Sequence, residues 1–203
     1  MSTGSDIYYS PARQGEAIYR EKASKFIGLA YPVNTEGEIR DILATVRKKI
    51  YDANHHCYAY CLGATQEVFR FNDDGEPSGS AGRPIYGQIQ SKGLSDALVI
   101  VVRYFGGTKL GIPGLIKAYR TAASEALENS GKKERTITKT CTVTFGYENM
   151  NDVMRIIKAE NLELLSQESG NNCKIVFRVR ASREEKVLAR FRRNVNIYIS
   201  VDV

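Results

Sequence analysis

The spacing of apolar residues restricts the fold of this chain more than any other feature. It follows the pattern of a strand in some segments and that of a helix in others. Residues 97–102 form the longest apolar run, which is typical of a buried strand. Residues 115–127 instead place their apolar side chains in one helical stripe, which Gly131 ends. This mixture predicts the α+β class. The longest run is far shorter than the roughly 18 residues of a membrane span.

The polar run at residues 131–135 has no apolar periodicity and predicts a boundary between two domains, at 15–130 and 137–203. Residues 1–14 are polar, and we expect them to be frayed. The first domain is expected to hold four strands, a helix capped by Asn34 or Thr35, a short helix and a long one. The strands are predicted at 26–33, 57–62, 67–71 and 97–102, and the later helices at 84–90 and 115–127.

The second candidate domain repeats the order β-α-β-β-α-β, which is the ferredoxin-like arrangement. Its strands are predicted at 138–145, 163–167, 174–179 and 197–203, its helices at 150–157 and 183–193, and a hairpin turn at 170–172.

The net charge and the number of cysteines indicate which partners and which cellular compartment to expect. The chain has 29 Lys and Arg against 23 Asp and Glu, a net charge of +6, which favours acidic partners such as nucleic acid only mildly. Its four cysteines are too sparse for a disulfide scaffold, so we expect reduced thiols packed as small hydrophobic groups. No secretory signal pattern begins the chain. We therefore expect a cytoplasmic protein that does not associate with membranes.

A loop rich in glycine, serine and proline at residues 74–84 is the first candidate site. Backbone amides that converge in such a loop, ahead of a helix, form an anion-binding concavity. The predicted anion-binding residues here are Ser78, Gly79, Gly82 and Arg83. The alternative is a tight loop with an Asp-Gly turn and a capped helix, which explains most of the same residues.

A second glycine-rich segment, residues 103–114, joins the buried strand to the long helix. Strand, glycine turn and helix is the geometry of a phosphate cradle, although the spacing matches neither a Walker loop nor a dinucleotide fingerprint. The predicted anion- or nucleic-acid-binding residues are Arg103, Gly106, Gly107, Lys109 and Gly111. The alternative is an ordinary turn bearing two solvated cations.

Both histidines lie together at positions 55 and 56, and on a strand one of them should face a cleft. Imidazole titrates near neutrality, so His55, His56, Asp74 and Glu76 are the candidates for acid–base catalysis. Histidines held by hydrogen bonds for structural reasons are commoner. Too few metal ligands are near in sequence for a zinc site, and we expect neither a metal nor a cofactor.

Several of these motifs together resemble the IMPACT/YigZ family. The matching segments are Asn-His-His-Cys-Tyr at 54–58, Asp-Asp-Gly-Glu-Pro-Ser-Gly at 73–79, Ala-Gly-Arg-Pro at 81–84, and Val-Arg-Tyr-Phe-Gly-Gly-Thr-Lys-Leu-Gly at 102–111. Ser-Lys-Phe at 24–26 and Ala-Tyr at 118–119 also fit. The likeness covers residues 15–130, and the remainder resembles the small C-terminal domain of the bacterial YigZ branch. One departure is Pro113-Gly114, where the family usually has Gly-Gly, since proline removes an amide donor.

The resemblance implies both a fold and a function. It implies a first domain like the α+β domains of ribosomal and elongation-factor proteins, and a ferredoxin-like second domain. Eukaryotic members regulate translation through a partner of a stress-activated kinase, and nucleic-acid binding is proposed for bacterial members. The resemblance implies no enzyme activity.

Three function hypotheses follow. The leading one is a non-catalytic binding protein that engages RNA or a ribosome-associated surface and is linked to translation regulation. The second is an enzyme acting on a phosphate-bearing small molecule through the acid–base candidates. The third is a protein–protein adaptor. We expect the three motifs to meet in one cleft, because glycine-rich turns at strand ends cluster at the edge of a sheet.

Overall fold

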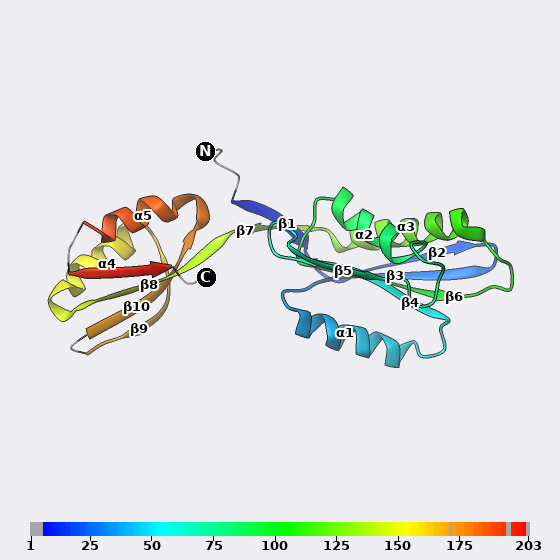
Figure 1. Ribbon diagram of the computed structural model, residues 1–203, viewed down its shortest axis with the longest axis horizontal. Coiled ribbons are helices and arrows are strands. Elements are labelled where there is room, and N and C mark those ends of the chain that lie inside the picture. The colour runs from blue at the N-terminus through cyan, green and yellow to red at the C-terminus, as the bar shows by residue number, and fades with distance from the viewer. Residues whose placement is uncertain (1–5, 171, 194–195, 202–203) are drawn as a thin grey trace. The chain divides into compact units, whose positions relative to one another are not determined.

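The computed structural model describes residues 6–170, 172–193 and 196–201 (Figure 1). Its contacts divide the chain into two compact units. The first unit is Tyr8–Arg135, and the second is Thr136–Val203 together with Met1–Ile7. Each unit has its own apolar core. Whether residues 137–203 fold without the rest of the chain stays a prediction.

The first unit is built on a five-stranded antiparallel sheet in which the predicted buried strand, β6 (Ala97–Tyr104), is central. Seven of its eight residues are buried, as an apolar run covered on both faces should be. The sheet order is β2 (Gly15–Glu21), β3 (Ser24–Pro32), β6, β4 (His55–Leu62) and β5 (Val68–Asn72).

Helices cover both faces of this sheet (Figure 1). Helices α2 (Gly82–Ser91) and α3 (Gly111–Ser130) pack on one face, and α1 (Glu36–Lys49) packs on the other. The cap of α1 is Thr35, whose side chain accepts a hydrogen bond from the Glu38 amide at 3.2 Å. Helix α3 comes very close to β3, which the absence of a side chain at Gly28 allows. A Cβ on Gly28 would lie 2.3 Å from the Ala122 carbonyl oxygen.

Two polar segments form strands where irregular structure was expected. Strand β1 (Ile7–Pro11) pairs with β7 (Lys132–Thr136), so much of the predicted boundary run and part of the N-terminal segment are ordered. Most of the side chains of β7 are exposed or half-buried, and for that reason its sequence carries no apolar alternation. Strand β2 was also not predicted from the sequence.

The second unit has the ferredoxin-like topology that its element order predicts. Its antiparallel sheet has the order β11 (Ile197–Val201), β8 (Thr138–Gly146), β10 (Asn172–Arg180) and β9 (Glu163–Glu168). Helices α4 (Met150–Ala159) and α5 (Glu184–Phe191) pack on it, after the short turns η1 (Tyr147–Asn149) and η2 (Ala181–Arg183). The predicted turn at 170–172 and the last strand lie partly outside the described residues.

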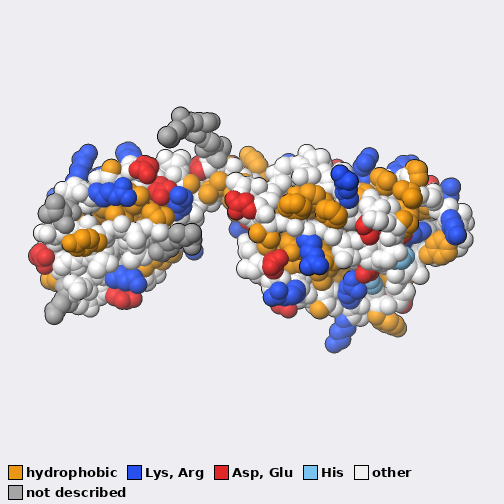
Figure 2. All heavy atoms as spheres, viewed as in Figure 1, with side chains coloured by type: hydrophobic (Ala, Val, Ile, Leu, Met, Phe, Trp, Pro, Cys, Tyr) orange, Lys and Arg blue, Asp and Glu red, His pale blue; other side chains and the backbone are white. Residues whose placement is uncertain are grey.

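The surface shows no concentration of one charge on the face drawn in Figure 2, where Lys and Arg are interspersed with Asp and Glu. All four cysteines are buried, and none of them forms a disulfide within the described residues. Among the described residues, no helix has the length and apolarity that crossing a membrane requires.

Candidate functional site

The start of β4, the end of β6 and the start of α3 surround a cavity of about 450 Å³. Strands β4 and β6 are antiparallel neighbours, and their register places His55 opposite Arg103. The Asp74–Pro84 loop contributes Glu76, and the glycine turn after β6 contributes Phe105 and Lys109. Segments of three predicted motifs therefore meet at one end of two inner strands of the sheet.

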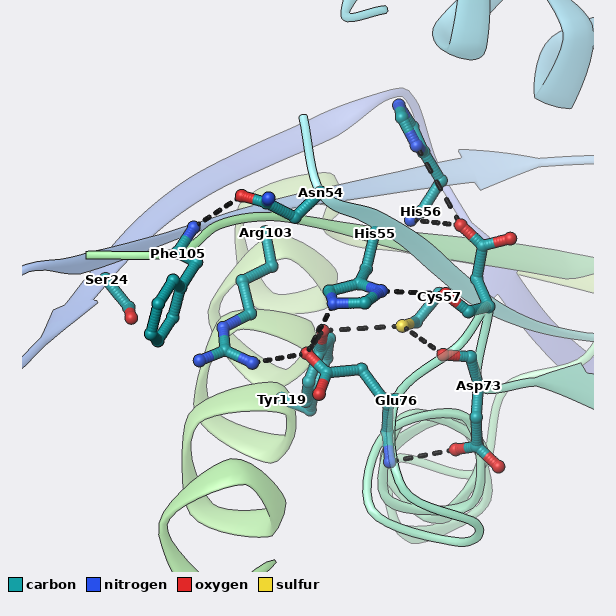
Figure 3. A network of polar contacts seen from close by, with 12 residues as sticks. Ser24, Asn54, His55, His56, Cys57, Asp73, Glu76, Arg103, Phe105 and Tyr119 are labelled. Carbon is teal, nitrogen blue, oxygen red and sulfur yellow. Dashed lines mark hydrogen bonds and ion pairs between the residues drawn. The ribbon is translucent and has the colours of Figure 1, made fainter. Parts of the chain in front are cut away.

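The carboxylate of Glu76 is the centre of the polar contacts (Figure 3). Its Oε1 accepts a hydrogen bond from Arg103 Nη1 at 2.6 Å and another from the Tyr119 hydroxyl at 2.8 Å. The side chain of Glu76 is only 3% exposed, and that of Arg103 is 6% exposed. A charge removed from water needs an opposite charge and hydrogen bonds, and these two groups supply them to each other.

The guanidinium of Arg103 contacts two aromatic rings in addition to Glu76. Its Cζ lies 5.4 Å from the ring centroid of Phe26 and 5.4 Å from that of Phe105. Its Nε is buried and has no hydrogen-bond partner. Arg103 is thus a fixed group whose charge is balanced by Glu76, and the exposed ring of Phe105 is positioned by it.

The two histidines point to opposite faces of β4, as strand geometry requires (Figure 3). The Nδ1 of His55 lies 2.8 Å from the Asp74 carbonyl oxygen, so in the neutral ring Nδ1 carries the proton. Its Nε2 lies 3.8 Å from Glu76 Oε1, and the ring lines the cavity. The Nε2 of His56 instead donates to the Ile50 carbonyl oxygen at 2.9 Å.

The Asp74 carboxylate stabilises the loop and lies outside the cavity lining. It accepts a hydrogen bond from the His56 amide at 2.6 Å and pairs with Arg47 at 2.7 Å. Partial burial raises the pKa of Asp74, but the hydrogen bonds from His56 and Arg47 outweigh burial and leave the pKa lowered. Asp74 is therefore an ionised structural group.

An internal carboxylate occupies the amide concavity that the first glycine-rich loop was expected to offer to an external anion. Asp73 accepts hydrogen bonds from the amides of Gly79, Ala81 and Gly82 at 2.8 to 3.0 Å. It therefore caps the start of α2 from outside the helix. Because Gly79 and Gly82 donate inward, the exposed Ser78 and Arg83 are left as the anion-binding candidates of this loop.

The glycines of the second loop have different roles. The Gly106 amide donates to Ser24 Oγ at 3.2 Å, and a Cβ at Gly106 would lie 2.1 Å from the Ala23 carbonyl carbon. Gly107, with φ of 84°, has open space where a side chain would stand. Gly111 begins α3 and lines the cavity beside the exposed Lys109.

Cys57 offers no activated nucleophile. Its Sγ lies 3.0 Å from the Asp73 carbonyl oxygen and 3.4 Å from the Tyr119 hydroxyl. Burial raises the pKa of both the Cys57 thiol and the Tyr119 hydroxyl, so both stay protonated near neutrality. In the residues that the structure describes, no group of three or more His, Cys, Asp or Glu is placed to hold a metal ion.

The predicted site residues are only partly brought together. Those that line the cavity are His55, Glu76, Arg103, Lys109 and Gly111. Gly79 and Arg83 line a separate groove, while His56, Asp74, Ser78, Gly82, Gly106 and Gly107 line neither space.

Three residues that the sequence interpretation did not assign to the site also belong to this region. Phe105 presents a ring to the cavity, Tyr119 donates to Glu76, and Asp73 fills the amide concavity. A sequence signal existed for one of them: a tyrosine within the alanine-rich stripe of α3 needs a hydrogen-bond partner for its hydroxyl.

Residues 22–127 match the Impact N-terminal domain, which spans the whole cavity. The chain belongs to the IMPACT family. It is 39% identical over 128 residues to the IMPACT family member YvyE of Bacillus subtilis, covering 63% of this chain and 59% of that protein. It is 31% identical over 149 residues to the IMPACT family member YigZ of Escherichia coli, covering 72% of this chain and 73% of YigZ.

A crystal structure described as that of a hypothetical protein is similar along nearly the full length. The TM-score is 0.74 at 26% sequence identity, and the likeness covers 96% of each chain. The two-part α+β architecture is thus shared with a solved structure, while the family match covers residues of the first unit.

Proposed function

We propose that this IMPACT family protein is a non-catalytic binding protein for single-stranded RNA, with a role linked to translation regulation. One observation carries the proposal: an exposed aromatic ring, and a cation that forms no ion pair among the described residues, line the same cavity beside a fixed guanidinium. Phe105 is 44% exposed, and Lys109 lies on the same rim. Proteins that bind single strands combine stacking rings with cations for the backbone.

The electrostatics of the cavity favour binding without sequence preference. Glu76 balances the charge of Arg103, so Lys109 is the cation left for a phosphate. A base that stacks on Phe105 is held through its flat face, which every base has. Phosphate contacts position a nucleic acid without reading it.

Membership of the IMPACT family supports the link to translation regulation. Residues 22–127, which carry the family match, contain all of the cavity lining. RNA exposed on a ribosome-associated surface has the same chemistry as a free single strand, so both fall within the proposal.

Anisotropy titrations of unrelated RNA oligomers at several salt concentrations test this function. We expect log affinity to fall with log salt by about 0.7 for each phosphate that the protein contacts. Lys109→Ala should weaken binding to all sequences alike and make the slope shallower by about 0.7. Phe105→Ala should cost about 1–3 kcal/mol of binding.

Lys48→Ala is the matched control, because Lys48 is an exposed residue of α1 on the opposite face of the sheet. Equal losses in Lys109→Ala and Lys48→Ala would show that only net charge matters. Tight, salt-insensitive binding to a single sequence would show a different mode of recognition.

An acid–base enzyme is the second candidate, and the orientation of His55 favours it. The Asp74 carbonyl fixes the ring so that Nε2 faces the cavity. Turnover of a phosphorylated small molecule that is abolished in His55→Gln, and retained in His56→Gln, would select this function over RNA binding.

A further inference from the structure

The groove between α2 and α3 has the chemistry of a second anion-binding site. Its volume is about 670 Å³, and its lining includes Arg83 from α2 and Arg120 from α3. Both arginines are exposed, and neither forms an ion pair within the described part of the chain. Among those same residues, no Asp or Glu lines the groove. Two uncompensated guanidinium groups therefore face one space, each with a fork of donors that suits a phosphate.

The groove is open down to the backbone of α2. A Cβ placed on Gly87 would meet no atom within 4 Å, in contrast to Gly28, where it would strike α3. Glycine inside a helix costs about 0.5–1 kcal/mol relative to alanine, and packing does not explain it here. Gly87 lies one turn after Arg83 on the same face of α2, so a ligand can approach the helix closely beside that arginine.

Helix α3 connects this groove to the first cavity. Ile112 lines the cavity and Ile116 lines the groove, one turn or about 6 Å apart along the axis. Arg120 lies about 12 Å beyond Ile112 along the axis of α3, so a ligand that reaches from the first cavity to Arg120 must extend over more than two turns of the helix. Ile112 is 54% exposed and offers an apolar surface between the two sites.

We propose that the α2–α3 groove is a phosphate subsite for the backbone of a single-stranded RNA whose base occupies the first cavity. This inference rests on the function proposed above, and it adds a requirement for length. A dinucleotide fills the first cavity alone, whereas an octanucleotide extends along α3 to Arg83 and Arg120.

The test compares labelled RNA dinucleotide and octanucleotide with the full chain and its variants. In Arg83→Ala/Arg120→Ala, octanucleotide affinity at low salt should fall by about tenfold or more, since each arginine supplies a charge-assisted hydrogen bond. The salt slope should become shallower by about 1.4, for two lost contacts. Dinucleotide affinity should stay unchanged. The control Arg40→Ala/Lys48→Ala removes two exposed charges from α1 and should change neither affinity.

The failures of the two proposals are distinguishable. If Lys109→Ala weakens octanucleotide binding and the double arginine variant does not, the groove is refuted while the first cavity stands. Equal losses of octanucleotide affinity in the double arginine variant and in its control also refute the groove. So does an acidic peptide that displaces the octanucleotide and binds as tightly as the octanucleotide does. If the unmodified chain binds neither RNA, both proposals are wrong. Circular dichroism of each variant confirms that the fold is intact.

Discussion

The buried pair of Glu76 and Arg103 allows a quantitative prediction about the site. Removing one member of a buried, hydrogen-bonded ion pair costs about 3–5 kcal/mol, because the other charge stays buried without a partner. We expect the lower end, about 3 kcal/mol, for Glu76→Gln, since Arg103 lines a cavity that water enters and contacts two aromatic rings. Glutamine keeps the shape and an acceptor for Tyr119, so the loss reports the charge.

A double-mutant cycle isolates the interaction. Arg103→Met should cost a similar amount, because it leaves the Glu76 carboxylate with the Tyr119 hydrogen bond and with His55 Nε2 at 3.8 Å. The double variant, which has no buried charge, should be more stable than the sum of the single losses implies by about 2–3 kcal/mol.

Hydrogen exchange of the α3 amides, followed by mass spectrometry, measures the stability of the first unit without a contribution from the second. In the regime where exchange follows the opening equilibrium, a loss of about 3 kcal/mol speeds exchange by about two orders of magnitude. The pair of Arg47 and Asp74, whose side chains are 48% and 23% exposed, is the control, and its coupling should stay below about 1 kcal/mol. Additivity within about 0.5 kcal/mol for Glu76 and Arg103 would refute the reasoning.

Three further predictions concern stability. Gly28→Ala should destabilise the first unit by about 1–3 kcal/mol, because the added Cβ overlaps with Ala122. Gly87→Ala should stabilise the same unit by up to about 1 kcal/mol, since its Cβ meets no neighbour. In thermal melts, the melting temperatures of the two variants should shift in opposite directions. Asp74→Asn should lower stability at pH 7, because the lowered pKa of Asp74 stabilises the fold above the unfolded value near 3.8; urea titrations should show the difference vanish as pH falls through the folded pKa. Residues 137–203 should show a cooperative thermal transition alone, and a fragment with none would contradict the boundary.

The elements found from sequence are those with a one-sided or fully apolar pattern. The buried β6 run and the stripe of α3 were predicted because burial alone determines their composition. Strands β1 and β7 escaped prediction because they pair through their backbones while most of their side chains are exposed or half-buried. The sequence of such a strand has no periodic pattern of apolar residues, and its strand conformation depends on pairing with the partner segment.

The candidate site shows the same limit at the level of single residues. The motifs identified Glu76, Arg103 and Lys109 as chemically interesting, and the structure places all three around one cavity. The sequence could not show that Glu76 and Arg103 contact each other, since that follows from the placement of the loop across β4. Nor could it show that Asp73, nine residues before Gly82, accepts that glycine's amide hydrogen bond.

Internal carboxylates explain how a basic chain can hold glycine-rich loops without exposing a strongly positive pocket. The Asp73 carboxylate accepts hydrogen bonds from the amides of one loop, and the Glu76 carboxylate pairs with Arg103. Carboxylates of the chain itself therefore occupy the positions where an external anion was expected to bind. In the proposed function, binding energy for an external phosphate comes from Lys109, Arg83 and Arg120, which line the cavity and the groove and form no ion pair among the described residues. Such contacts are exposed to solvent and screened by salt, so each contributes modestly and affinity grows with the number of phosphates engaged. Length dependence, more than sequence preference, is therefore the property by which this surface should be recognised.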